Sequence, residues 1–459
     1  MLFFNLSAFY FFYFAAVGVY VIFLPKVLHD IGYSTFSIGI LLAIPLLMKF
    51  ITPFMFLKYI KLNQKMFKTA LVILIILSAL FYVTLESFYL FMINNALLGV
   101  CLSLILPYLE VTAVSNLGKE KYGKSRLFGS IGFMIISLVL AKFLTEPYVA
   151  VHYYLVLNIL TVIFAFLLLK FDVEQKEEET NIPFSFLKYL PFWLSLFFMQ
   201  ISFGAFYNFF TIYETQHGIS LEMTSYLWSF GVICEILMLY FQAPLLKNNL
   251  LNIIKFCVAV TTFRWVLLYL YPDSLTLTFY TQSIHAFSFG LYHSAVIIYL
   301  YTLYENKKLA QQFMYGVTYG LGGFIGALVA GAVYGEYLFL FSALFSLLSL
   351  IALYFIKNIE DDVDIIFIVG DPHSNNTRKL ASIAHDYHTC DVYMIESIED
   401  LEIEWLKNKR YAAVSSGAST PTYLTNQVID YLKQFDINDS KTYQKPIIDK
   451  NKILNQKDA

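Results

Sequence analysis

Glu235 and Lys49 are charged residues in the middle of long apolar runs. Glu235 is the only charged residue between Met223 and Leu246, and Lys49 follows Pro45 by four residues. A charged side chain at the centre of a bilayer costs about 2.5–3.5 kcal/mol, so such groups are kept where they bind a solute or move a proton. The alternative is an ion pair that locks helices together, with Glu235 bonded to Lys49 or to Arg264.

Arg264 and Glu110 extend this set of intramembrane charges. Arg264 has no charged neighbour between Lys255 and Asp273, and Glu110 follows Pro107, whose ring frees nearby backbone groups. An arginine in an apolar run is available to an anionic solute. Glu110 has a competing interpretation as a residue one or two turns from the membrane surface.

One side of the segment 275–302 combines polar and aromatic side chains, namely Gln282, His285, Phe289, Tyr292 and His293. Histidine changes charge near neutral pH and can relay protons. A core histidine held by one hydrogen bond is the alternative. The spacing of eight between the two histidines differs from the i, i+4 pair of zinc helices, so we expect no metal site.

The elements that must hold these residues are membrane helices. Of the 459 residues, 58% are hydrophobic and 14% are charged, against about 25% charged in soluble domains. Runs long enough to cross the hydrocarbon core fall at 5–25, 35–57, 67–85, 88–114, 125–144, 150–170, 188–213, 223–246, 251–271, 275–302, 311–335 and 337–357. The four cysteines are not closely spaced, which indicates neither a disulfide framework nor a metal site.

Lysine and arginine gather in the even-numbered loops, as in Lys58, Lys61, Lys65 and Lys68, and in Lys119, Lys121, Lys124 and Arg126. The odd-numbered loops carry acids and histidines, among them Glu214 and His217, with Lys26 and Lys142 as exceptions. The positive-inside rule therefore predicts cytoplasmic termini in a multi-pass protein of the inner (plasma) membrane.

The apolar part of the chain repeats itself. A shift of 186 positions places Gly18 on Gly204 and Lys49 on Glu235. Duplicated sets of helices with solute sites between them are typical of transporters. We therefore expect two six-helix bundles at 1–171 and 188–357, joined by a cytoplasmic linker at 172–187.

The composition changes after Lys357. Residues 360–435 predict a small cytoplasmic α/β module, with strands at 363–369, 392–395 and 411–414 and helices at 376–387, near 398–408 and after Thr420-Pro421. Ser397 and Asp400 have the spacing of a helix cap, and so does Thr420 before Pro421. Residues 436–459 are expected to form a loose polar tail.

Three segments resemble the signatures of phenylpropionate-permease-type transporters of the major facilitator superfamily. They are Tyr122 to Phe133, Leu227 to Glu235, and Gln282 to Gly290. The resemblance implies proton-coupled symport of a small organic solute, either an aromatic acid or a nucleoside-like compound. Position by position it supports Arg126 as a gating residue and Glu235 and His285 as the proton-linked pair, and more weakly Lys49 and Glu110.

Two segments of the tail, Val369 to Leu380 and Ser416 to Pro421, resemble the last third of hydroxymethylbutenyl diphosphate reductase. The resemblance implies a diphosphate site at Ser374, Asn376 and Ser419, where strand-to-helix turns point backbone N–H groups at an anion. The reductase needs three cysteine ligands for its iron–sulfur cluster, and the tail has only Cys390.

The sequence thus predicts an all-α membrane protein of the major facilitator fold with a small α/β module. We expect it to be a transporter and not an enzyme, driven by the proton gradient without a cofactor. Its expected partners are a small solute, the lipid bilayer and a phosphate or diphosphate at the tail, with no nucleic acid. The pathway residues are Lys49, Glu110, Glu235, Arg264, His285 and His293. Two alternatives remain, namely a membrane sensor that signals through its tail and a transporter fused to a remnant of the reductase.

Overall fold

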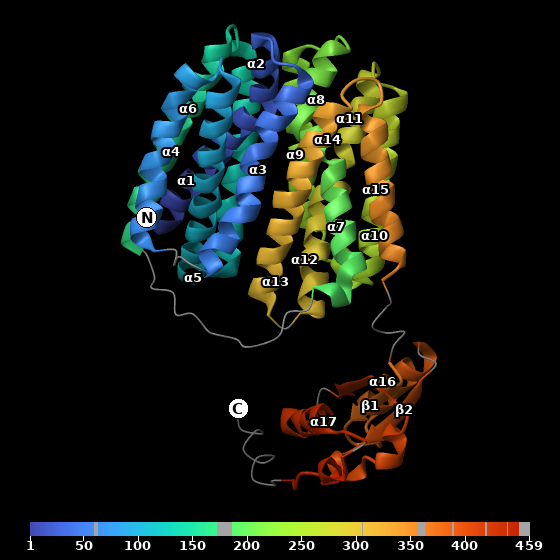
Figure 1. Ribbon diagram of the computed structural model, residues 1–459. Coiled ribbons are helices and arrows are strands. Elements are labelled where there is room, and N and C mark those ends of the chain that lie inside the picture. The colour runs from blue at the N-terminus through green and yellow to red at the C-terminus, as the bar shows by residue number, and fades with distance from the viewer. Residues whose placement is uncertain are drawn as a thin grey trace. The chain divides into compact units, whose positions relative to one another are not determined.

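The computed structural model describes residues 1–58, 63–171, 186–304, 306–356, 363–387, 390–417, 420–437 and 439–448; the side chains of 53–58, 111–122, 308 and 386–387 are left aside. The chain divides into a membrane unit, Met1–Phe355, and a tail unit, Ile356–Ala459 (Figure 1). Each unit is described by itself.

The first half of the membrane unit consists of antiparallel helices and a short π-helical turn. Its elements are α1 (Leu2–Gly18), η1 (Val19–Phe23), α2 (Leu24–Ile31), α3 (Thr35–Lys58), α4 (Gln64–Thr84), α5 (Phe88–Phe143) and α6 (Pro147–Leu168). The α5 helix holds two spans, Phe88–Glu110 and Gly123–Phe143. Glu110 contacts Arg126 at 2.7 Å, whereas sixteen residues of straight helix would separate them by about 24 Å. The backbone therefore reverses between the two spans.

The second half repeats this arrangement. Its elements are α7 (Leu190–Ser202), α8 (Gly204–Gln216), α9 (Leu221–Phe241), α10 (Leu250–Leu270), α11 (Leu275–Ser283), η5 (Ala286–Leu291), α12 (Tyr292–Leu303), α13 (Lys307–Met314), η6 (Tyr315–Gly322), α14 (Gly323–Ala332) and α15 (Leu338–Tyr354). The π-helical segments η5 and η6 lie inside the tenth and eleventh spans. Such segments often mark functional positions in helices.

The described helices confirm the expected twelve spans. Eleven are long and apolar enough to cross a membrane, and α15 is a shorter apolar helix in the twelfth position. The linker at 172–187 falls almost entirely outside the described residues. Both halves run side by side with their helix axes roughly parallel (Figure 1).

The two halves meet through close backbone contacts and polar pairs. A Cβ atom at Gly39 of α3 would lie 2.8 Å from the carbonyl oxygen of Ala327 in α14, so only glycine allows this approach. Ser137 of α5 and Ser229 of α9 share a hydrogen bond of 2.7 Å. Gln216 at the end of α8 bonds His29 of α2 at 3.2 Å.

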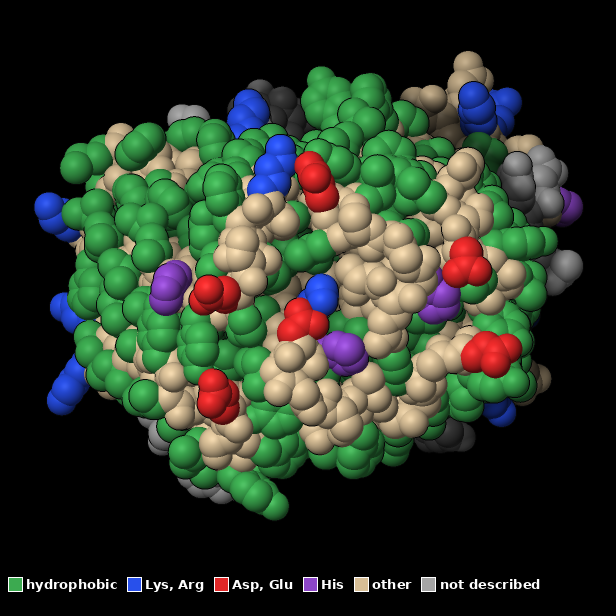
Figure 2. Space-filling view, turned by 90° about the horizontal axis from the view of Figure 1, so that it is seen from above, with side chains coloured by type: hydrophobic (Ala, Val, Ile, Leu, Met, Phe, Trp, Pro, Cys, Tyr) green, Lys and Arg blue, Asp and Glu red, His purple; other side chains and the backbone are tan. Residues whose placement is uncertain are grey.

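We call the end of the membrane unit that carries the loops 32–34, 85–87, 144–146, 217–220, 271–274 and 333–337 the odd-loop face. Seen from above, acidic and histidine side chains are scattered over it among apolar ones, with few lysines or arginines (Figure 2). The charge pattern expected for a non-cytoplasmic face is therefore present at this end. The opposite end is called the even-loop face.

The tail unit is a parallel sheet with helices. Its strands are β1 (Ile365–Val369), β2 (Asp391–Ile395) and β3 (Ala412–Ser416), in the order β2-β1-β3. The central strand is buried along its whole length, as expected of an unbroken apolar run. The helices α16 (Asn375–Tyr387) and α17 (Thr422–Gln434) follow β1 and β3, and Val428 of α17 lies in the same core as Phe367.

Three local predictions in the tail need correction. The helix expected near 398–408 is two short 3-10 turns, η8 (Ile398–Asp400) and η9 (Ile403–Leu406), although Ser397 and Asp400 do form the capping box. Thr420 does not cap α17, because its hydroxyl donates to the carbonyl oxygen of Val369 at 3.1 Å. The described residues after 436 pack back on the unit, since Tyr443 stacks on Phe435.

Candidate functional site

Arg264 is the best-connected charge among the predicted site residues. Its side chain is completely buried, and its Nη1 lies 3.1 Å from both Nδ1 of His285 and Oγ of Ser288. Its Nη2 donates to Oε1 of Gln282 at 3.2 Å. The guanidinium also lies 4.5 Å above the ring of Phe206. Three of its contacts thus reach the segment from Gln282 to Ser288, which Arg264 anchors to α10.

The contact with Arg264 selects the tautomer of His285. Arginine can only donate hydrogen bonds, so Nδ1 of His285 must be the acceptor and its ring proton lies on Nε2. That nitrogen faces Oε2 of Glu235 on α9 at 3.7 Å. The expected pairing of His285 with Glu235 is therefore present, with the N–H of the ring directed at the carboxyl group.

Aromatic rings extend from this pair along η5 and α12. His285 stacks on Phe289 at 5.5 Å and 5°, and Phe289 stacks on His293 at 5.9 Å and 10°. The hydroxyl of Tyr319 in η6 lies 2.9 Å from Nδ1 of His293, and Tyr319 stacks on Tyr315. We name His285, Phe289, His293, Tyr315 and Tyr319 the aromatic ladder. Two histidines and two tyrosine hydroxyls on flat rings suit an aromatic solute with polar edges.

Glu110 and Arg126 form the second charged pair of the site. Nη1 of Arg126 lies 2.7 Å from Oε1 of Glu110. Arg126 is also near enough to Glu235 and His293, which belong to the other half, for their charges to interact. Glu110 was expected on the pathway and Arg126 as a gating residue, and the reversal within α5 brings the two together.

Lys49 makes no hydrogen bond or ion pair within the described part of the chain, and its side chain is only partly exposed. The ion pair with Glu235 that the sequence left open is therefore not formed. The next residue, Phe50, packs against Gly320 of η6, where a Cβ atom would lie 2.8 Å from Cβ of Phe50. Lys49 thus lies on the helix that borders the aromatic ladder without joining its polar contacts.

The exposure of the charged groups rises toward the even-loop face. The side chain of Arg264 is buried, Glu235 is 15% exposed, Glu110 is 23% exposed and Arg126 is 41% exposed. In contrast, the polar pairs Ser137–Ser229 and His29–Gln216 join the halves toward the odd-loop face. The site is therefore closed toward the odd-loop face and most accessible near Arg126.

Glu214 is a buried carboxylate that the sequence placed wrongly in a loop. The α8 helix continues to Gln216, and Glu214 has no exposed surface. The expected span ended at residue 213, one residue short of it.

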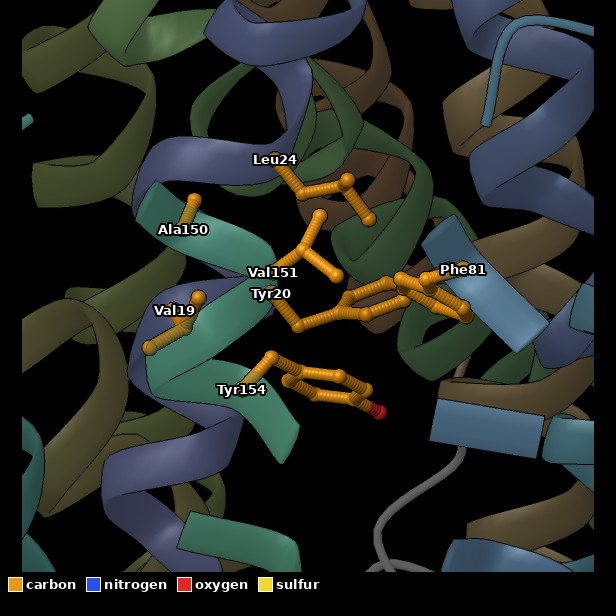
Figure 3. Close-up of a pocket in the computed structure, with 7 residues that line it drawn as sticks. All are labelled: Val19, Tyr20, Leu24, Phe81, Ala150, Val151 and Tyr154. Atoms are coloured by element: carbon orange, nitrogen blue, oxygen red, sulfur yellow. The ribbon is translucent and has the colours of Figure 1, made fainter. Parts of the chain in front are cut away.

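A small apolar pocket lies within the first half of the membrane unit and apart from these charges. Figure 3 shows its lining residues, Val19, Tyr20, Leu24, Phe81, Ala150, Val151 and Tyr154. Phe81 and Tyr154 stack there at 5.1 Å. None of the lining residues is charged, so this pocket offers no ionic group to bind a charged solute.

The tail places its two motif loops together at the carboxyl edge of the sheet. The N–H of Gly417 donates to Val369 at 3.3 Å, and Gly370 has a φ of 147°, which disfavours any residue with a Cβ. Arg378 donates to the carbonyl oxygens of Pro372 and His373 and holds the first loop in shape.

Of the three anion-binding residues expected in the tail, Ser374 precedes α16 and Asn376 is exposed in its first turn. Ser419 lies outside the described residues.

Family comparisons agree with this division of the chain. Residues 3–347 match the model of the MFS_1 like family, and residues 355–433 match the model of the LytB protein family. Among solved structures, the nucleoside transporter NupG is 15% identical with a TM-score of 0.64, and the match covers 78% of this chain and 100% of that chain. An autoinhibited POT family peptide transporter is 12% identical with a TM-score of 0.59, over 78% of this chain and 97% of that one. The membrane unit therefore has the major facilitator fold.

Several curated relatives match about a fifth of the chain. The 4-hydroxy-3-methylbut-2-enyl diphosphate reductase of Geobacillus thermodenitrificans (strain NG80-2) is 42% identical over 84 residues, which are 18% of this chain and 27% of the reductase. The reductase of Bacillus velezensis (strain DSM 23117 / BGSC 10A6 / LMG 26770 / FZB42) is 43% identical over 99 residues, or 20% of this chain and 32% of the reductase. The chain thus spans about a third or less of the length of these relatives.

Proposed function

Since the chain belongs to the MFS_1 like family, we propose that this multi-pass membrane protein is a secondary active transporter that couples proton entry to the uptake of a small organic solute. The observation that carries the proposal is the contact between Glu235 and the Nε2–H edge of His285, with both side chains nearly buried between helices. A carboxyl group in such a position can exchange its proton with the site as the bundles rock about it.

The solute of this proposal is an aromatic acid or a nucleoside-like compound. The aromatic ladder offers flat rings for stacking, and His293 and Tyr319 offer polar edges. Lys49 supplies a cation without a protein partner in the described residues, whereas Arg264 is fully buried and each of its Nη atoms already donates a hydrogen bond within the protein. We therefore assign Lys49, and not Arg264, to an anionic group of the solute.

The protein is proposed to lie in the inner membrane with both termini in the cytoplasm. The acids and histidines of the odd-loop face support this orientation. In that orientation the site near Arg126 is accessible from the cytoplasm.

A thermal-shift screen of aromatic acids, nucleosides and isoprenoid diphosphates tests the assignment of the solute. A ligand of the ladder should raise the unfolding temperature of the chain, and the shift should disappear in His293→Ala. A thermal shift that remains in His293→Ala and disappears on deletion of residues 360–459 would show that the ligand binds to the tail.

The second candidate function is a membrane sensor that reports through a diphosphate-binding tail. It is favoured by the adjacent loops at Gly370 and Gly417 on the sheet edge. Deletion of residues 360–459 separates the candidates, because a transporter should retain uptake and a sensor should lose only its downstream response.

Reductase activity of the tail is not proposed. The tail carries one cysteine, Cys390, whereas an iron–sulfur cluster is held by several thiolates. Its donor set therefore does not fit a cluster, and we expect no iron in the purified protein. An iron assay checks this expectation. Protein without iron would also agree with the alternative that the tail is a fused remnant of the reductase.

A further inference from the structure

Glu214 is a buried carboxylate that the proposed proton path through Glu235 does not use. It has no exposed surface, and neither of its carboxylate oxygens has a hydrogen-bond partner among the described residues. An ionised carboxylate in such a place would lose its hydrogen bonds to water and gain none from the protein. The group is therefore far more stable there with a proton than without one.

Glu214 lies in the last turn of α8, a helix that meets the first half at the odd-loop face. The α8 helix packs against η1 and α2 of the first half, and two residues beyond Glu214 the side chain of Gln216 bonds His29. Helical spacing places Glu214 on the same side as Thr211, which accepts a hydrogen bond from Trp228 at 3.1 Å. Two turns deeper on this side is Tyr207, which is near enough to Glu235 and Arg264 for Coulombic interaction.

The charged and titratable groups around it leave Glu214 without a counter-ion. On α8, on the helical elements packed against it and on the adjoining loops these groups include Tyr20, Lys26, His29, Asp30, Tyr207, Tyr213, His217, Glu222, Tyr226, Cys234, Glu235, Tyr240, Asp273, Tyr334, Glu336 and Tyr354. Lys26 is paired with Asp30 at 2.8 Å, and His217 bonds the carbonyl oxygen of Tyr213 at 2.8 Å. Within the described residues, no cation of this set forms an ion pair with Glu214.

We propose that Glu214 is a second proton-binding site of the membrane unit, and that its proton holds the odd-loop face closed. Loss of the proton would leave an unpaired negative charge buried in the last turn of α8, the helix that packs against the first half. The halves then separate at this face until water reaches the carboxylate. One proton leaves for each opening event, and the solute takes no part in the step.

The prediction is quantitative because a single proton is linked to the opening. Above the midpoint of the transition, the ratio of open to closed molecules should rise about tenfold for each pH unit. This inference does not depend on the proposed solute or on coupling through Glu235, because the conformation can be measured without any solute.

Pulsed electron paramagnetic resonance tests the proposal on the full chain in lipid nanodiscs. Nitroxide labels are attached at Thr145→Cys and Tyr337→Cys, two exposed positions of the odd-loop face in different halves. Cys234 and Cys390, the cysteines that are not buried, are replaced by serine. The distance between the labels is measured from about pH 5 to about pH 9, the range in which a desolvated carboxyl group titrates.

The expected result is a longer separation as the pH rises, and a short separation at every pH in Glu214→Gln. Glu86→Gln, which changes an exposed carboxylate of the same face whose partner Tyr148 lies in the same half, should behave as the unmodified chain. If Glu214→Gln does not fold, Glu214→Asp is measured instead, because the proposal requires the midpoint pH of the distance change to shift in this variant.

The proposal is overturned if the unmodified chain shows no transition, or if the transition persists unchanged in Glu214→Gln. It is also overturned if the transition persists in Glu214→Gln and is lost in His29→Gln.

Discussion

Arg264 holds His285 by a hydrogen bond of 3.1 Å from Nη1 to Nδ1. Because the guanidinium only donates, the ring of His285 presents its N–H at Nε2 to Glu235. The buried cation of α10 thus positions the histidine and leaves the carboxyl group of α9 as the member of the pair that can accept a proton. This arrangement leads to the following predictions.

The first prediction concerns the tautomer of His285. At neutral pH its Nδ1 should be unprotonated and its Nε2 protonated, because Arg264 occupies Nδ1. Nitrogen-15 NMR of histidine-labelled protein, assigned by comparison with His285→Gln, measures this directly. A protonated Nδ1 in the unmodified chain would show that the contact with Arg264 is not the one described.

The second prediction concerns the stability that Arg264 contributes. Arg264→Met removes the donors to His285, Gln282 and Ser288, and each buried acceptor left unpaired costs about 1–3 kcal/mol. We expect a large fall in the thermal unfolding temperature of the membrane unit. The exposed Lys247, in the loop before α10, provides the matched control, and Lys247→Met should leave the temperature unchanged.

The third prediction concerns the pair formed by Glu110 and Arg126. Glu110→Gln and Arg126→Gln should each slow uptake by about tenfold, which corresponds to about 1.4 kcal/mol. The double variant should be no slower than the worse single variant, because both changes remove the same interaction. Additive losses would mean that the two residues act independently.

The fourth prediction concerns the tail. Asp364 accepts hydrogen bonds from the backbone N–H groups of Arg410 at 2.6 Å and Tyr411 at 3.0 Å. These bonds, the one from Arg410 first, lower the pKa of its carboxyl group below the ordinary 3.8. The folded state therefore gains stability from the ionised group above the ordinary pKa, and it loses this gain as the pH falls through the lowered one.

Hydrogen exchange of the β1 and β3 amides in the full chain measures this effect. Protection should fall as the solution is acidified through the carboxyl range, and Asp364→Asn should weaken this dependence. An identical acid dependence in the variant would exclude Asp364 as its source.

Much of the fold could be predicted because its causes are local. Twelve apolar runs and the distribution of lysines determine the spans and the two halves, and the parallel strands of the tail follow from short apolar runs between helical patterns. Glu235 and His285 could each be singled out because each stands out within its own segment, and their pairing was predicted with the help of the family resemblance. Whether Lys49 contacts Glu235 could not be predicted. The sequence repeat places the two residues at equivalent depths of the two halves, but it does not show whether their side chains meet.

The features that could not be predicted depend on geometry between helices. The pair of Glu110 and Arg126 requires the reversal within α5, and the bond from Arg264 to His285 requires the angle between α10 and α11. The burial of Glu214 depends on how far α8 extends beyond its last apolar residue and on the helices that pack around its end. Thr420 does not cap α17 as the sequence predicted, because its hydroxyl donates a hydrogen bond to the carbonyl oxygen of Val369.

The central claim is that Glu235 carries the coupled proton, and uptake into proteoliposomes under an imposed pH gradient tests it most directly. The solute identified by the thermal-shift screen is followed in the unmodified chain, in Glu235→Gln and in the control Glu222→Gln. Glu235→Gln should lose accumulation against the solute gradient and retain exchange of internal for external solute, while the control retains both. Unchanged pH-driven accumulation in Glu235→Gln would contradict the account.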